Sequence, residues 1–130
     1  MANTITKQTL LDGSKTLRVK VNIEGTGDGD IDSEVIINAS EYDPPYTDCK
    51  ITNIESFLNG FTAKLEWAAD SPVMIMQLPQ GDSRYSDHSG LLNNAGAGKT
   101  GDILLSTADL EGFPNDKGTI IITIKKKGTF

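Results

Sequence analysis

The chain contains few of the residues that build catalytic and metal centres. Its 130 residues include one cysteine, one histidine and one tryptophan, and aromatic residues make up 6% of the total. Cys49 alone cannot form an intrachain disulfide, and one cysteine with one histidine does not supply the four ligands of a structural zinc site. Ser86, Asp87 and His88 are the residue types of a hydrolytic triad, but three consecutive side chains do not adopt triad geometry. We therefore expect neither an enzyme nor a bound cofactor.

Long apolar runs and clustered positive charge are also absent from the sequence. No apolar run approaches the roughly 18 residues of a membrane helix, and the N-terminus lacks the charged and apolar regions of a signal peptide. Acidic residues number 18 against 12 basic ones, for a formal charge of −6. The only basic run is residues 125–127, whereas binding to a nucleic-acid backbone needs clustered cations. These features predict a soluble protein, made in a cytosol, that binds neither membranes nor nucleic acid.

One short motif has the appearance of a nucleotide site. Gly98-Lys99-Thr100 ends in the same way as a phosphate-binding P-loop, but Asn93 occupies the position where that motif requires its first glycine. A P-loop also leads into a helix, whereas the alternation in residues 103–106 indicates a strand. We interpret residues 90–101 as a glycine-rich loop between two sheet elements.

A second motif has the appearance of a calcium site. Asp28, Asp30 and Asp32 have the spacing of the first three ligands of a calcium-binding loop. Ser33 and Ala39 occupy the positions of the glycine and glutamate that make such a loop bind tightly. We interpret residues 25–32 as a solvated acidic turn, and calcium at the three aspartates is the minor alternative.

Alternation of apolar and polar residues is the main positive signal. It is clearest in residues 16–24, and it recurs in residues 61–68 and 119–125. Asn59-Gly60 predicts a two-residue hairpin that joins residues 49–58 to 61–68. In that hairpin Leu58 faces Phe61, Ile54 faces Leu65, and Glu55 forms a cross-strand pair with Lys64.

Other segments complete a series of short strands. Residues 4–11 are extended before a turn at Asp12-Gly13, and this turn sets Ile5 opposite Val21 or opposite Lys20, depending on its length. Residues 34–38 form a short strand. Residues 73–78 are apolar on nearly both faces, which indicates a central strand or a strand covered by a subunit partner. Residues 79–89 are polar and irregular.

About eight short strands separated by turns predict an all-β fold. The alternatives are an antiparallel sandwich, a jelly roll or a partly open barrel. The length suits a single domain that spans residues 1–130. Residues 1–11 either pair within their own subunit or form an arm or swapped strand that exchanges with a neighbour.

Two segments resemble small virion structural proteins of tailed bacteriophages. These are residues 3–13, Asn-Thr-Ile-Thr-Lys-Gln-Thr-Leu-Leu-Asp-Gly, and residues 90–107, Gly-Leu-Leu-Asn-Asn-Ala-Gly-Ala-Gly-Lys-Thr-Gly-Asp-Ile-Leu-Leu-Ser-Thr. The resemblance implies a non-enzymatic virion protein, made in the host cytoplasm, that decorates or cements the capsid. It also implies partners among the major capsid protein and other virion proteins, and a homo-oligomer. The alternatives are a neck, tail or fibre-associated subunit, or a β module that binds carbohydrate on a host surface.

On this interpretation, the partner contacts fall on loop residues outside the core. The expected contacts in the glycine-rich loop and just before it are Leu91, Leu92, Asn93, Asn94 and Lys99. Tyr42 and Tyr46 flank the proline-rich connection of residues 40–48 and are further candidates. The alternative role of these tyrosines is to pack that connection onto its own domain.

Overall fold

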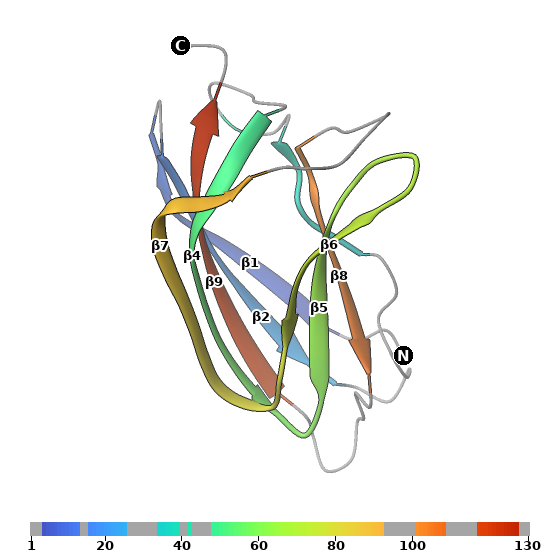
Figure 1. Cartoon of the computed structure of the whole chain (residues 1–130). Coiled ribbons are helices and arrows are strands. Elements are labelled where there is room, and N and C mark those ends of the chain that lie inside the picture. The colour runs from blue at the N-terminus through green and yellow to red at the C-terminus, as the bar shows by residue number, and fades with distance from the viewer. Residues whose placement is uncertain are drawn as a thin grey trace.

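The protein is built from two antiparallel β-sheets. The computed structural model describes residues 4–13, 16–25, 34–39, 42, 48–92, 101–108 and 117–127. Nine strands lie within them and no α-helix does (Figure 1). Their bounds are β1 Thr4–Asp12, β2 Thr16–Glu24, β3 Glu34–Ile37, β4 Asp48–Asn59, β5 Thr62–Trp67, β6 Val73–Leu78, β7 Gly81–Leu92, β8 Ile103–Ala108 and β9 Lys117–Lys127.

The strand order is that of a jelly roll. Sheet A has the order β1-β2-β9-β4-β7, and sheet B has the order β3-β8-β5-β6. The paired strands are nested in the sequence. The pair closest in sequence is β5 with β6, and the pairs β4 with β7, β3 with β8 and β2 with β9 enclose it in turn. A long antiparallel hairpin that folds across two layers produces this nesting. The prediction of an antiparallel all-β sandwich is confirmed, and both sheets are open.

The core lies between the two sheets and is mainly apolar. From sheet A, the alternate residues Leu17, Val19 and Val21 of β2 are fully buried, as the period-two pattern predicts. From sheet B, Leu65 and Trp67 of β5 are at most 1% exposed to solvent. The inward side chains of β9 belong to the same cluster. Burial of this surface is the main force that holds the two layers together.

The Asn59-Gly60 turn connects the two sheets and does not close a hairpin. Strand β4 pairs with β7 and β9, whereas β5 pairs with β6 and β8. The predicted pairings of Leu58 with Phe61, Ile54 with Leu65 and Glu55 with Lys64 are therefore wrong. Gly60 has φ of 92°, and glycine adopts this conformation without steric cost. Asn59 is the last residue of β4, and the turn that follows it is a corner between the two layers.

Gly118 of β9 packs closely against the residues that flank this corner. A Cβ atom on Gly118 of β9 would lie 2.6 Å from Leu58 Cδ2 and 2.9 Å from Phe61 Cζ. Phe61 and Leu58 are both buried. The aromatic ring of Phe61 therefore occupies space that a side chain at position 118 would take.

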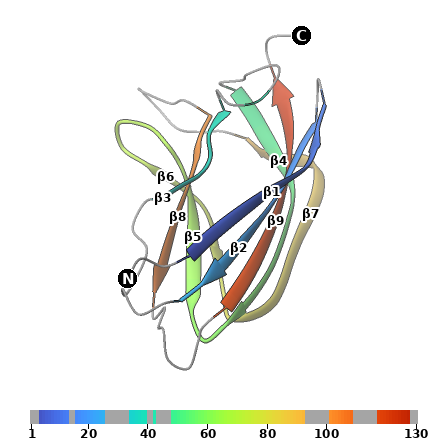
Figure 2. The same ribbon diagram turned by 180° about the vertical axis from the view of Figure 1, so that it is seen from behind.

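Strand β1 pairs with β2 of the same chain in a register that differs from both alternatives. Ile5 lies opposite Ile23, and neither Val21 nor Lys20 is its partner. The register shifts between Thr9 and Leu11, and Asp12 then lies opposite Leu17. A longer connection and a bulge together account for the difference. Figure 2 shows β1 beside β2 at the edge of sheet A.

Two further segments differ from the sequence prediction. Residues 81–92 form strand β7, although residues 79–89 were expected to be irregular; their polarity reflects a strand at the edge of a sheet. Strand β6 also lies at an edge, in sheet B, and is not a central strand. Although β6 is almost entirely apolar, its two faces are not both buried within this chain.

Candidate functional site

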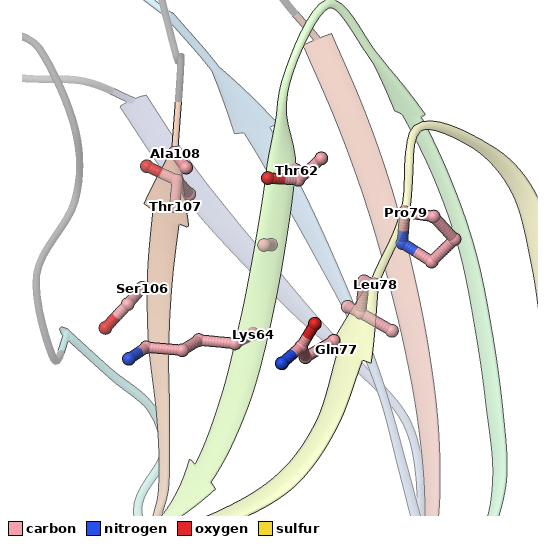
Figure 3. A pocket seen from close by; sticks show the side chains of 9 residues that line it. Thr62, Lys64, Gln77, Leu78, Pro79, Ser106, Thr107 and Ala108 are labelled. Carbon is pink, nitrogen blue, oxygen red and sulfur yellow. The ribbon is translucent and has the colours of Figure 1, made fainter.

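Sheet B carries a hollow of about 680 Å³ near the start of β5 (Figure 3). Three of its polar side chains come from one row of residues across three strands. Lys64 on β5 lies opposite Ser106 on β8 and opposite Gln77 on β6. Figure 3 shows the Lys64 side chain extended across β8 toward Ser106. This row presents an ammonium, a hydroxyl and an amide, which together suit a polar or anionic group of a ligand.

The hollow offers hydrogen bonds through the side chains of Lys64, Gln77 and Ser106. Across the described part of the chain, no cluster of three or more histidine, cysteine, aspartate or glutamate side chains has the geometry to hold a metal ion. No helix among those residues is long and apolar enough to span a membrane.

The outer face of sheet A collects basic side chains from three neighbouring strands. Lys50 on β4 lies directly opposite Lys125 on β9. In the next rows, Arg18 on β2 lies opposite Thr123, and Lys20 lies opposite Ile121. We call Arg18, Lys20, Lys50 and Lys125 the cationic patch; Glu55 on β4 lies in the same row as Lys20. The sequence shows only residues 125–127 as a basic run, and strand pairing adds the other three members.

The opposite end of the same face is aromatic and polar. Phe57 is 59% exposed and lies opposite Thr119 on β9 and Asp82 on β7. It borders a hollow of about 370 Å³ that Asn22 and Thr119 also line. The Thr119 hydroxyl donates a hydrogen bond to Asn22 Oδ1 at 2.9 Å. An exposed aromatic ring is thus held beside an ordered pair of polar groups.

The described contact candidates lie partly against the core. Tyr42 and Leu91 are half-buried and pack onto the hydrophobic core. For Tyr42 this agrees with the alternative role, in which the tyrosine packs onto its own domain and not against a partner. Leu91 and Leu92 belong to β7, where they lie opposite Ile51 and Lys50. The expectation that these two leucines are loop residues is wrong, because the strand continues to Leu92.

The remaining candidates lie outside the described residues. They are Tyr46, Asn93, Asn94, Lys99 and the three aspartates of the calcium alternative, Asp28, Asp30 and Asp32. Their predicted roles stay predictions.

Several exposed apolar residues were missed by the reading of the sequence. Phe57, Val35 and Met74 are each at least 40% exposed on the outer faces of the sheets. A signal for them is present, because each stands beside another apolar residue in a strand, and adjacent residues point to opposite faces. One of the two must then face outward, as Phe57 does beside buried Leu58.

Comparison with known proteins gives only distant similarity. No protein-family model and no curated protein matches the chain. Among solved structures, cobalt(II) HppE in complex with substrate aligns at 11% identity with a TM-score of 0.32, over 91% of this chain and 51% of that chain. Hydroxypropylphosphonic acid epoxidase from S. wedmorenis aligns at 11% identity with a TM-score of 0.30, over 90% and 49%. This chain thus spans about half the length of these proteins, and similarity at this level assigns no activity to it.

Proposed function

We propose that this protein is a non-enzymatic structural subunit of a tailed-bacteriophage particle, and that it decorates the capsid and bridges neighbouring major capsid subunits. The resemblance of residues 3–13 and 90–107 to small virion proteins supports the class. The cationic patch is the structural observation that carries the docking role. A protein of net charge −6 places Arg18, Lys20, Lys50 and Lys125 on one broad face.

Two of these cations, Lys50 and Lys125, lie directly opposite each other on the sheet. An acidic partner surface supplies opposite charge to such a contact. We propose that sheet A docks by this patch on an acidic surface of the capsid.

Many equivalent sites make a modest contact sufficient. A decoration subunit binds a symmetric lattice, where contacts to neighbouring subunits add through effective concentration. A rigid sandwich keeps the outer face of sheet A and the hollow on sheet B in fixed relation. Such a subunit can contact two neighbours without paying for reorganisation of its own fold.

Charge reversal on purified particles tests the docking role. The double variant Lys50→Glu/Lys125→Glu retains a like-charged pair, so the stability of the fold should change little. We expect its affinity for undecorated particles to fall by at least about tenfold, which corresponds to about 1.4 kcal/mol. Lys7→Glu/Lys117→Glu is the matched control, because it makes the same charge change at two exposed lysines elsewhere. Equal occupancy of both variants in co-sedimentation would contradict docking through the patch.

Two further experiments define the location on the particle. Deletion of residues 94–98 tests whether the glycine-rich loop contributes, and unchanged occupancy would remove that segment from the interface. Copy number in a cryo-EM reconstruction separates capsid decoration from a neck, tail or fibre position. A symmetric capsid lattice offers far more equivalent sites than a neck or tail.

Phe57 favours a second candidate function, namely binding to carbohydrate on a host surface. Sugar rings stack their C–H faces on exposed aromatic rings and hydrogen-bond to neighbouring amides and hydroxyls. The exposed ring of Phe57 beside Asn22 and Thr119 provides both elements. Glycan-array binding that Phe57→Ala abolishes would support this alternative, and absence of binding by the intact protein would remove it.

A further inference from the structure

The two sheets have four edge strands, and β6 differs from the others. Strand β7 carries the exposed charges Asp82 and Arg84, and β3 is only four residues long. Strand β1 carries exposed Lys7 and a register shift after Thr9. Charge, short length and bulges are the devices by which proteins protect sheet edges from pairing.

Strand β6 has little of this protection. Its sequence, Val-Met-Ile-Met-Gln-Leu, contains neither a charge nor a proline over six residues. Its ladder with β5 shifts register at Ile75, which is its one protective irregularity. On the far side of β6, no strand pairs with it within the described residues. Uncharged edges of this composition are the ones that recruit another strand.

Burial along β6 indicates that the strand is incompletely covered by its own chain. Val73, Ile75 and Met76 are only half-buried, and Met74 is 41% exposed. On the adjacent β5, the inward residues Leu65 and Trp67 are fully buried. Leu78 at the end of β6 is buried, whereas residues 73–76 retain exposed apolar surface that a neighbouring strand would remove from water.

We infer that β6 pairs antiparallel with β6 of a second copy of this chain, which joins two four-stranded sheets into one of eight strands. The backbone donors and acceptors of a sheet edge are satisfied by another strand. A second copy supplies one about a two-fold axis, the commonest arrangement of oligomers. Because β6 is uncharged, no register of the strand against itself opposes like charges, and flexible methionine side chains adapt to the contact.

Net charge predicts how salt acts on this association. Each copy has a formal charge of −6, so two copies repel each other, and added salt screens that repulsion. Self-association through β6 should therefore strengthen from about 50 mM to about 500 mM NaCl. Docking through the cationic patch should weaken over the same range. Self-association through β6 is measured on the isolated protein, and docking through the cationic patch is measured on particles. A negative result for one surface therefore does not contradict the proposal for the other.

Sedimentation of the isolated protein tests the inference. We expect the intact protein to form a dimer at micromolar concentration and Met74→Lys to be monomeric. Val35→Lys is the matched control, because Val35 is 40% exposed on β3, at the opposite edge of the same sheet. This control should remain dimeric. A monomeric intact protein at about 100 μM, or a dimer that persists in Met74→Lys, would overturn the inference.

Two additional measurements do not depend on the folding of one variant. Gln77→Lys places a charge at an exposed position of β6 and should also give a monomer. Hydrogen exchange on the intact protein should show protection of β6 amides that increases with protein concentration, while β3 amides do not change. Protection of β6 that is independent of concentration would contradict pairing between copies.

Discussion

The side chain of Asp102 holds a backbone group that lies 63 residues away in the sequence. Its Oδ1 atom accepts a hydrogen bond from the Ala39 backbone nitrogen at 2.8 Å, and its backbone oxygen accepts one from the Ala68 nitrogen at 3.0 Å. Ala39 is fully buried. Asp102 therefore joins the ends of β3, β5 and β8, and it stands directly after Gly101, whose φ is 85°.

Removal of the Asp102 carboxylate should destabilise the protein. Asp102→Ala leaves the buried Ala39 amide without this acceptor, and an unsatisfied buried donor costs about 1–3 kcal/mol. Asp102→Asn retains an oxygen at the same position and should lose less. Urea denaturation of both variants measures the difference. Equal stability of Asp102→Ala and the intact protein would show that the hydrogen bond is dispensable.

Gly118 should tolerate no side chain. A methyl group there would meet Leu58 Cδ2 at 2.6 Å, Phe61 Cζ at 2.9 Å and the Phe57 backbone oxygen at 3.2 Å. Overpacking of a core typically costs about 1–3 kcal/mol, and we expect Gly118→Ala to lower the unfolding free energy by that amount. Gly13→Ala is the comparison, since its nearest contact would be Thr16 O at 3.4 Å. A thermal midpoint that falls equally in both variants would argue against the packing at Gly118.

The partner of Glu55 distinguishes the corner from a hairpin. Glu55 lies opposite Arg84 on β7, whereas Lys64 is in the other sheet. A double-mutant cycle between Glu55 and Arg84 should give a coupling of about 0.2–1 kcal/mol. The same cycle between Glu55 and Lys64 should give none. The reverse pattern would restore the hairpin that Asn59-Gly60 suggests.

The hydroxyl of Ser56 contributes no hydrogen bond to the core. Ser56 Oγ is buried without a partner in the structure, and its residue is 4% exposed. Removing such a group relieves a desolvation cost, so Ser56→Ala should be neutral or stabilising by about 1 kcal/mol. Chemical denaturation measures the change. A loss of more than about 1 kcal/mol would mean that the hydroxyl has a partner.

The periodic pattern of the sequence was a reliable guide to burial. The alternation in β2 and β5 correctly identified Leu17, Val19, Leu65 and Trp67 as core residues. It succeeds because consecutive side chains of a strand point to opposite faces, whatever the strand pairs with. The candidate site was less accessible, because the cationic patch consists of residues distant in sequence that only pairing brings together.

The sequence by itself determined that this chain is all-β and which alternating side chains enter its core; it left a sandwich, a jelly roll and a partly open barrel as alternatives. Tertiary structure decided which strands pair, that Asn59-Gly60 is a corner between layers, and that β6 lies at an edge. The physical reason is the separation in sequence of the residues that each property involves. Periodicity and turn propensity are properties of a few consecutive residues, whereas strand order depends on contacts such as Phe61 against Gly118, which form only when distant segments pack.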